Sequence, residues 1–411
     1  MKSRTNGAAL KRLISRFALY GAIALAALMM VTFSLGQSAA KQVAQNDLTV
    51  HEWGTFTSIA GADGQPMDWL SLTGSTDLPG FVEHFHDVKF KGGLRGTVRM
   101  ETPVIYFYSS GENTVSVEAT FSKGLITEWY PHADSVNPGL STPYFSLHSM
   151  DSPGAISWNS VHIDPHAAAD FLSDSSENHY YAARATASAP IDVPASSGPQ
   201  REKFLFYRGV AAFAPPITVT VPSDRTVQLQ TDSAEEIPDA ILFERRGSKA
   251  GYRVLGPLSD QAAFALPNLG GSIDSVASDL EQTLIARGLF ADEAHAMLET
   301  WKNSWFEEGA RLIYIVPRAF VDSVLPLTIK PAPANKVRVF VGRLELITPA
   351  TQQAVESAFE TGDRATLAKY SRFLDPILLY MVQQSTDEQR QKRLSRYLDS
   401  LPLAVSGQAA K

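Results

Sequence analysis

The sequence contains no cysteine, so it offers no disulfide framework, no thiol nucleophile and no lipoprotein cysteine. Glycine and proline, at 27 and 24 of 411 residues, are near the average usage of folded proteins, which excludes collagen-like and low-complexity chains. Common catalytic signatures are absent as well: there is no GxSxG nucleophile elbow, GxxxxGK phosphate loop, GxGxxG turn or HExxH helix. An ordinary hydrophobic core must therefore hold the protein together, and no motif names a reaction.

Basic residues are scarce outside the N-terminus. The formal net charge is −7, but residues 1–40 hold five of the 36 bases and no acid. Removing those five leaves 31 bases against 43 acids, a net charge of −12 for the rest of the chain. A body this acidic is repelled by a phosphate backbone, so nucleic acid is not expected as a partner.

A long run without charge occurs at residues 17–35, after the five bases and before the small residues at 36–40. This order is typical of a secretory signal, with Ser38 and Ala40 suited to cleavage before Lys41. As a helix the run would be about 28 Å long, close to the thickness of a bilayer core, so an uncleaved inner-membrane anchor is the alternative. In both cases we expect a periplasmic or extracellular body that touches the membrane only through residues 17–35, if these are retained.

Residues 47–256 consist of short aromatic and β-branched runs separated by Gly, Pro, Ser and Asp, which is typical of strands. No segment of helical period lies between these runs, which favours antiparallel, sandwich-like sheets over a parallel βαβ arrangement. Residues 131–154 and 191–201 are expected to be loops. The predicted strands are residues 48–59, 97–108, 114–121, 125–130, 155–163, 179–186, 203–213, 217–221, 226–230, 240–245 and 252–255.

The pattern changes after Pro267. Apolar residues at helical spacing predict helices over 272–287 and 292–308, the second with Trp301 and Trp305 one turn apart on its core face. Strands are predicted at 311–316, 325–329 and 337–347. The last is expected to rejoin the β-rich portion, and it needs two covered faces or a bulge at Gly342. A helical tail follows, capped by Thr348 with Pro349 in its first turn. Its helices are expected at 351–360, 364–384 and 387–398, with Pro376 kinking or breaking the middle one.

These patterns predict an α+β protein, an antiparallel β-rich, sandwich-like body with C-terminal helices packed on the sheet. We divide the chain into a signal peptide or anchor at 1–40, a β-rich domain at 41–267 and a mixed helix and strand region at 268–411. Two independent domains with a boundary near Pro267 are the alternative partition.

Histidine is distributed unevenly, since eight of the nine precede residue 180. On an extended backbone His84 and His86 point to the same face, and such a pair can supply two imidazoles to one divalent metal such as zinc. A third ligand would come from another segment. The candidates are His162, Asp164, His166 and His179. The alternative is that His84 and His86 are solvated loop histidines without a ligand.

Carboxylates beside aromatic residues provide a second catalytic hypothesis. A glycosidase needs two carboxyl groups at a defined separation, and tryptophans and tyrosines can form a surface on which a sugar stacks. The alternative is that these aromatics form the core and the cross-strand pairs of a β-domain. The carboxylates in question are Glu52, Glu83, Glu101, Glu118, Glu128 and Asp164.

Six segments together resemble a group of uncharacterised exported bacterial proteins whose mature body starts His-Glu-Trp-Gly-Thr-Phe-Thr. The segments are HEWGTFTSIAG (51–61), RMETPVIYFY (99–108), LITEWYP (125–131), HYYAAR (179–184), EKFLFYRGV (202–210) and RVFVGRLELITP (338–349). The resemblance covers nearly the whole body. It implies an exported protein of Gram-negative type and supplies no activity, cofactor or functional residue.

Three classes of function remain open. A non-enzymatic cell-envelope protein that binds an envelope polymer or another envelope protein is the leading hypothesis, because the body is β-rich and acidic and lacks a catalytic signature. A metal-dependent hydrolase that uses the histidines of the N-terminal half is the first alternative. A metal-independent glycan-active enzyme is the second.

Overall fold

The structure is a computed structural model that describes residues 47–70, 78–84, 95–137, 153–175, 178–223, 225–231 and 235–406. Leu48–Lys411 forms one compact unit, separate from Met1–Asp47. The predicted signal or anchor at residues 1–40 and the predicted ligand His86 lie outside the described residues. Among the described helices, none is long and apolar enough to cross a membrane.

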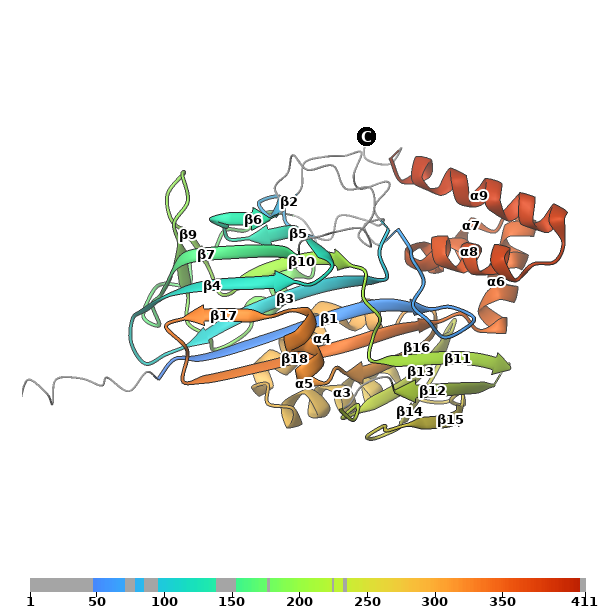
Figure 1. The fold of residues 1–411 in the computed structure, drawn as a ribbon, viewed down its shortest axis with the longest axis horizontal. Helices are drawn as coiled ribbons and strands as arrows, with labels where there is room; N and C mark the ends of the chain where they lie inside the picture. Colours follow the sequence, from blue (N-terminus) through green and yellow to red (C-terminus); the bar gives the residue numbers. More distant parts are fainter. Residues whose placement is uncertain are drawn as a thin grey trace, which may run out of the picture. The chain divides into compact units, whose positions relative to one another are not determined.

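A nine-stranded sheet forms the centre of this unit (Figure 1). Its neighbouring strands are antiparallel except for the parallel pair in the middle, β1 and β18, which come from opposite ends of the unit. In sheet order the strands are β14 (Lys249–Val254), β13 (Ala240–Arg246), β16 (Gly309–Ile315), β18 (Asn335–Leu346), β1 (Thr49–Ala60), β3 (Val98–Tyr108), β10 (Leu205–Ala211), β5 (Gly124–Tyr130) and β2 (Glu83–His84).

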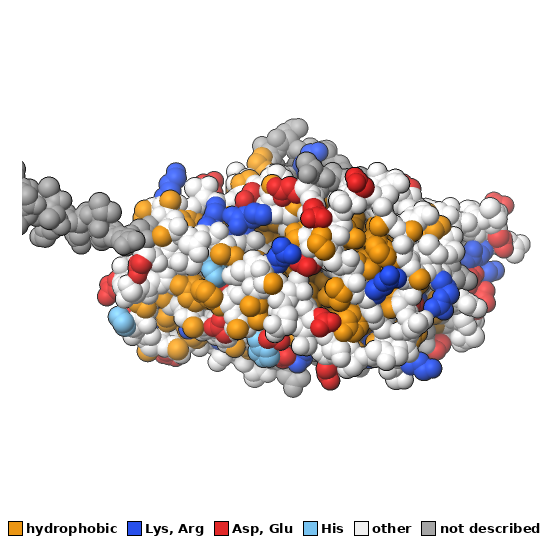
Figure 2. Space-filling model, turned by 90° about the horizontal axis from the view of Figure 1, so that it is seen from below, with side chains coloured by type: hydrophobic (Ala, Val, Ile, Leu, Met, Phe, Trp, Pro, Cys, Tyr) orange, Lys and Arg blue, Asp and Glu red, His pale blue; other side chains and the backbone are white. Residues whose placement is uncertain are grey.

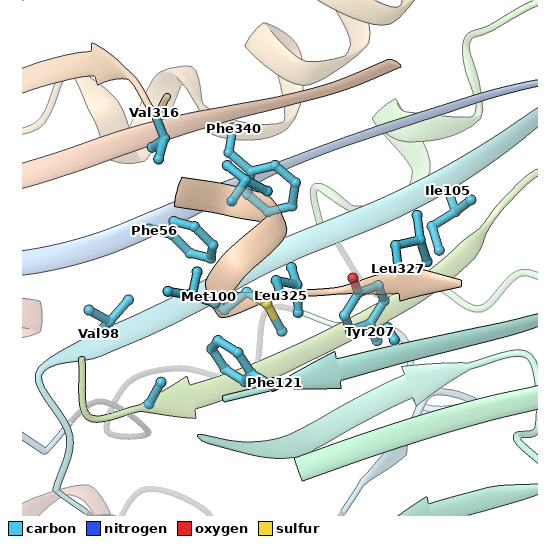
Figure 3. Close-up of a cluster of buried hydrophobic side chains, with 14 of the residues drawn as sticks. Phe56, Val98, Met100, Ile105, Phe121, Tyr207, Val316, Leu325, Leu327 and Phe340 are labelled. Atoms are coloured by element: carbon cyan, nitrogen blue, oxygen red, sulfur yellow. The ribbon is translucent and has the colours of Figure 1, made fainter. Parts of the chain in front are cut away.

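Two smaller antiparallel sheets share a hydrophobic core with one face of the nine-stranded sheet. Figure 3 shows this core, in which Phe121 and Leu327 of a smaller sheet lie near Met100 and Tyr207 of the large one. The arrangement confirms the predicted sandwich-like body. The three-stranded sheet is β11 (Ile217–Ser223), β12 (Thr226–Thr231) and β15 (Gln261–Ala265). The six-stranded sheet is β17 (Leu327–Lys330), β4 (Asn113–Phe121), β7 (Gly154–Ile163), β8 (Ile191–Val193) and β9 (Gln200–Glu202), with β6 (Ser135–Asn137) paired to β7.

Helices cover the opposite face of the nine-stranded sheet, in two separate hydrophobic clusters. In the first, α3 (Ile273–Ala286) and α4 (Ala291–Trp305) pack on Trp53 and Val341, and Trp301 and Trp305 lie in this core as expected. In the second, the C-terminal helices pack on Ile59 and Ile347. Since Ile59 alternates with core residues of the other face, both clusters lie on the helical side. The C-terminal helices are α6 (Pro349–Thr361), α7 (Arg364–Lys369), α8 (Leu374–Gln384) and α9 (Glu388–Ser406).

The predicted long strand is β18, and both of its faces are covered. Its register with β1 and β16 runs without a shift, so Gly342 marks no bulge but a close approach to the ring of Tyr314. The helical tail also begins as predicted, because the Thr348 hydroxyl accepts a hydrogen bond from the backbone N–H of Thr351. The predicted break falls earlier than Pro376, at the 3₁₀ turn Ser371–Phe373, which leaves the proline in the first turn of α8.

The predicted strand at 179–186 is wrong, since the structure has a 3₁₀ helix at Tyr180–Arg184. The three-residue repeat of this helix buries Tyr180 and Ala183 together, and Arg184 reaches Glu202. Burial of these side chains outweighs the β-propensity of the two tyrosines. The predicted loops at 131–154 and 191–201 contain β6, β8 and the start of β9. Elements that were not predicted are β2, β15 and the short helix α5 (Arg318–Val324).

Candidate functional site

Three neighbouring strand pairs of the central sheet lose their regular register at the same level. The shift lies between Trp53 and Thr55 where β1 meets β3, between Phe206 and Gly209 where β10 meets β3, and between Arg208 and Gly209 where β10 meets β5. Bulges of this kind are over-represented next to functional sites, because they re-aim side chains out of the regular ladder. This line of bulges therefore marks a candidate functional site.

Thr102 lies at the centre of this line and has a left-handed backbone, with φ of 42°. A threonine is strained in this conformation, and such strain clusters at functional sites. The hydroxyl groups of Thr102 and Thr55 are buried and find no hydrogen-bond partner within the described residues. Gly54 lets the backbone of β1 lie close to Phe340 and Pro103. A Cβ at this position would lie 2.7 Å from the Phe340 ring and 3.2 Å from the Cα of Pro103.

Five polar side chains follow the line of bulges across adjacent strands, and we call them the polar row. They are His84 on β2, Glu128 on β5, Arg208 on β10, Glu101 on β3 and Thr55 on β1. The register pairs His84 with Glu128, Glu128 with Arg208, and Glu101 with Thr55, and paired residues share a face of the sheet.

The polar row runs from half-exposed to fully buried. His84 and Glu128 are half-buried at the β2 edge, whereas Arg208 is 3% exposed and Glu101 and Thr55 are 0% exposed. The Nδ1 atom of His84 lies 3.4 Å from the carbonyl oxygen of Val82, and the Thr127 hydroxyl donates a hydrogen bond to Glu128. The row thus presents an imidazole and a carboxylate at its accessible end.

Ionic contacts continue from the buried end of the row towards the helices. Glu101 accepts a hydrogen bond of 2.9 Å from the Thr57 hydroxyl and forms ion pairs with Arg99 and Arg372. Ser304 at the end of α4 accepts hydrogen bonds from both Arg372 and Arg343. These contacts connect α4 and the 3₁₀ turn Ser371–Phe373 to the sheet.

A second buried group lies on the other face of the sheet. The Arg338 side chain forms an ion pair with Glu52, and both are 0% exposed, while the Tyr207 hydroxyl donates a hydrogen bond of 2.6 Å to Glu52. Burial raises the pKa of Tyr207, and the charge of Glu52 raises it further. Burial alone lowers the pKa of Arg338, but the carboxylate of Glu52 outweighs this effect and leaves that pKa above its usual value. The group is a structural ion pair held in the core.

A third group joins the start of β1 to α4. The Nδ1 atom of His51 lies 2.7 Å from a carboxylate oxygen of Glu293, and the Tyr108 hydroxyl donates a hydrogen bond of 2.9 Å to the other oxygen. Burial raises the pKa of Tyr108, and the charge of Glu293 adds to the shift. This group therefore fixes α4 against the sheet with charge-assisted hydrogen bonds.

Glu83 and His132 form a more exposed pair at the β2 edge. The Nδ1 atom of His132 lies 2.8 Å from one oxygen of Glu83, and the indole N–H of Trp129 donates to the other at 3.0 Å. Glu83 pairs with Trp129 in the sheet, so it points to the face opposite His84. The pair thus stands apart from the polar row.

The predicted metal ligands do not gather in the described part of the chain. His162 lies on β7 near Thr114 and Glu112, and Asp164 accepts a hydrogen bond from the backbone N–H of His166 just beyond it. His179 is exposed at the start of the 3₁₀ helix. His84 lies on the nine-stranded sheet, whereas His162 lies on the six-stranded sheet. Among the described residues, no group of three or more His, Asp and Glu side chains is placed to hold a metal ion. Because His86 lies outside those residues, the metal site stays a prediction.

The aromatic residues beside the carboxylates are mostly core. Trp53, Trp69 and Trp158 are 0% exposed, so their rings are not available for stacking on a sugar. Of the carboxylates considered for glycan chemistry, Glu128 and Glu101 belong to the polar row. The others lie apart: Glu52 in the buried pair with Arg338, Glu83 with His132, Glu118 exposed on β4 and Asp164 after β7.

The polar row was not predicted, although four of its five strands were, β2 being the exception. Gly54 and Gly209 within strand patterns, and Thr102 before Pro103, are signals of bulges. They could have located the irregular positions. They could not have shown that the bulges fall side by side, because strand order is a property of the tertiary structure.

No protein-family model matches the chain, and no curated protein matches it. Among solved structures, it is similar to the yeast delta-COP-I mu-homology domain, alone and in complex with a Dsl1 WxWxV peptide. For the complex, the TM-score is 0.25 at 10% identity, over 73% of this chain and 96% of that chain. For the domain alone, the TM-score is 0.26 at 10% identity, with the same coverage. A likeness of this size carries no conclusion about fold or function.

Proposed function

We propose that this protein is exported to the cell envelope and binds an envelope polymer or an envelope protein there, with the polar row as its binding site. The observation that carries the proposal is the pair of buried hydroxyls, Thr55 and Thr102, without a partner in the described residues, beside a strained backbone. Buried polar groups in native proteins are nearly always hydrogen-bonded, so orphaned ones point to a bound water or ligand group. His84 and Glu128 provide the accessible end of the same row.

The side chains on one face of the molecule favour contact at short range over electrostatic capture. Figure 2 shows acidic and basic side chains interspersed over one face, with hydrophobic side chains gathered between them. A mixed distribution does not steer a highly charged polymer from a distance. Specificity would then come from the polar row itself.

A binding experiment with matched variants tests the site. Purified sacculi, lipopolysaccharide and a glycan array serve as probes for the wild type, Glu128→Gln and the exposed control Glu118→Gln. We expect the Glu128 variant to bind about tenfold more weakly, the typical effect of a lost charge-assisted hydrogen bond, and the control to bind like the wild type. No binding to any envelope component, together with turnover of a generic ester, phosphate or glycoside, would contradict the proposal.

Export rests on the basic, apolar and small-residue order of residues 1–40. N-terminal sequencing of the protein recovered from its source cell should start near Lys41 if the segment is cleaved, or at Met1 in the membrane fraction if it is kept as an anchor. A full-length product in the soluble cytoplasmic fraction would overturn this part of the proposal.

The metal-dependent alternative has its own test. Elemental analysis of untagged protein, purified without chelator, is compared between the wild type and the double variant His84→Ala, His86→Ala. The alternative expects one divalent ion per chain in the wild type and loss of that ion in the variant, with weaker binding below about pH 6.5, where imidazoles become protonated. Metal far below one per chain in the wild type, or full metal in the variant, eliminates the site.

A further inference from the structure

The outer strands of the three sheets differ in how they are protected from pairing with another chain. An exposed edge strand is normally blunted by charges, prolines or coverage. In the described part of the chain, five outer strands carry such protection. Charged or ionisable side chains lie on β14 (Lys249 and Arg253), β2 (Glu83 and His84) and β9 (Arg201 and Glu202), and β14 is also partly covered at Gly271. β17 ends in Lys330 before Pro331, and β11 contains Pro222. By contrast, β15, with the sequence Gln-Ala-Ala-Phe-Ala, carries neither a charge nor a proline. The outer strand β6, Ser-Val-Asn, shares this composition but has only three residues.

The hydrogen-bond pattern shows which backbone groups of β15 point outward. The N–H of Leu266 donates to the carbonyl of Arg225, and the N–H of Thr231 donates to the carbonyl of Asp260. Since bonded pairs alternate along an antiparallel ladder, Ala262 and Phe264 bond to β12. The N–H and C=O groups of Gln261, Ala263 and Ala265 therefore point away from the sheet.

The side chains of β15 divide in the same alternating way. Gln261, Ala263 and Ala265 are exposed, whereas Ala262 and Phe264 are half-buried. Phe264 packs against the sandwich core, and the guanidinium of Arg253 lies over its ring at 5.4 Å. The strand thus has a small, uncharged outer surface and one large side chain anchored on the inner face.

We propose that β15 pairs antiparallel with β15 of a second copy, about a twofold axis through Ala263. In this register Ala263 faces Ala263 of the second copy and Gln261 faces Ala265, so every outward N–H and C=O of the strand is satisfied. On the inner face Phe264 of one copy lies opposite Ala262 of the other, a large side chain against a small one. No like charges meet, and the two three-stranded sheets become one continuous six-stranded sheet.

A second copy fits this edge better than an unrelated peptide because the strand is complementary to itself in one symmetric register. A twofold contact requires such self-complementarity. Pairing of two five-residue strands is small compared with the roughly 1,200–2,000 Å² of a standard interface, so the dimer should depend on concentration.

The absence of cysteine makes a crosslinking test direct. In the full chain, Ala263→Cys would place two thiols on the twofold axis with Cα atoms about 5.5 Å apart, within disulfide range. The matched control is Gln228→Cys, which is exposed and pairs with Ala263 one strand further in. Its two copies would be about 15 Å apart, beyond disulfide range. We expect mild oxidation to give at least about tenfold more covalent dimer for Ala263→Cys than for Gln228→Cys.

Sedimentation velocity over a concentration series supplies the second measurement. The wild type should show a monomer–dimer equilibrium, and Ala263→Asp, which sets two carboxylates face to face, should remain monomeric with an unchanged circular dichroism spectrum and melting temperature. Equal crosslinking of the two cysteine variants, a monomeric wild type at every concentration, or an unchanged dimer in Ala263→Asp would each overturn the proposal. Pairing of β15 with a partner's peptide while the protein stays monomeric would overturn it too.

Discussion

Charged side chains in the core are the main feature of this protein at the scale of single residues. Taking a charge out of water costs several kcal/mol, and that cost is offset only when partners satisfy the group. Each of the buried carboxylates named below has a basic or hydroxyl partner within hydrogen-bond distance. They are Glu52, Glu101, Glu202 and Glu293.

The pair Arg338–Glu52 should therefore be sensitive to loss of one partner. Arg338→Met leaves the carboxylate of Glu52 buried without its counter-charge, and we expect the free energy of unfolding to fall by about 3–5 kcal/mol. Urea denaturation measures this change. The exposed pair Lys392–Glu388 is the control, since Lys392→Met should change stability by less than about 0.5 kcal/mol. Equal effects of the two variants would show that the Arg338 pair is not the stabilising contact.

Asp322 is a partly exposed second partner of Arg338, and its ionisation makes the stability of the fold depend on pH. Burial alone raises the pKa of Asp322, but its hydrogen bonds and ion pairs with Arg338 and Arg318 outweigh this and leave the pKa below its ordinary 3.8. A carboxyl group with a lowered folded-state pKa contributes stability above its unfolded value and loses it as the pH falls through the folded value.

We expect the wild type to be more stable than Asp322→Asn at pH 5–7, and the difference to vanish towards about pH 2, where the group is protonated in both states. Denaturant midpoints across this range measure it. Asp170→Asn, at an exposed position, is the control and should run parallel to the wild type. A difference that stays constant down to the lowest pH would refute the role of the ion pairs.

Thr55 and Thr57 lie two residues apart on one face of β1, and their hydroxyl groups are expected to differ in their contribution to stability. The Thr55 hydroxyl has no partner within the described residues, so Thr55→Val should leave the free energy of unfolding unchanged or raise it by up to about 1 kcal/mol. Thr57→Val removes the hydrogen bond to buried Glu101 and should cost about 1–3 kcal/mol. Thermal or urea unfolding decides between them, and equal losses would mean that both hydroxyls are structural.

At the scale of elements, β18 shows how a local pattern and its surroundings combine. Its alternating apolar residues predict a long strand, but covered faces and a bulge at Gly342 were both compatible with the pattern. Tyr314 on β16 decides this, because its ring occupies the space beside Gly342.

Gly342→Ala should accordingly be strongly destabilising. A Cβ at this position would lie 2.1 Å from the Tyr314 ring, which must move within a packed core. We expect a loss of about 1–3 kcal/mol or more in the free energy of unfolding, measured by denaturation. In the double variant Gly342→Ala, Tyr314→Phe the loss should persist, since ring carbon atoms meet the added methyl group more closely than the hydroxyl does. A neutral Gly342→Ala would refute the close packing.

Local signals also account for some helix boundaries. The Ser272 and Thr348 side chains accept the N-terminal hydrogen bonds of α3 and α6, as capping chemistry requires. The 3₁₀ helix at Tyr180–Arg184 does not follow from local signals. Its aromatic sequence favours a strand, and only burial among residues distant in the sequence makes it helical.

At the scale of the whole molecule, the nine-stranded sheet takes strands from both sides of the boundary predicted at residue 267. From the N-terminal side, β1 pairs with β18 and β13 pairs with β16, both of which follow the boundary. Separation of the two parts would expose long unpaired strands inside the central sheet.

Limited proteolysis between β14 and α3 should therefore give fragments that stay together. We expect a nicked protein that elutes as one species in gel filtration and separates only in denaturant, and fragments 41–267 and 268–411 that do not fold when expressed alone. A cut in the exposed turn at Gly247 between β13 and β14 provides the comparison, since it also leaves both strands in one sheet. Two separately stable fragments would instead support independent domains.

The sequence by itself determined the class and most of the local elements of this protein: strands from alternation, helices from the 3.6-residue period, caps from Thr348 and Pro349, and the core role of Trp301 and Trp305. These features depend on neighbours a few residues away, so a single chain displays them. Only the tertiary structure decided that β1 lies beside β18, almost 300 residues later, and that bulges of separate strands fall on one line. The polar row arises from that strand order, because long-range pairing is selected by burial of the whole sheet and leaves no periodic trace in any one segment.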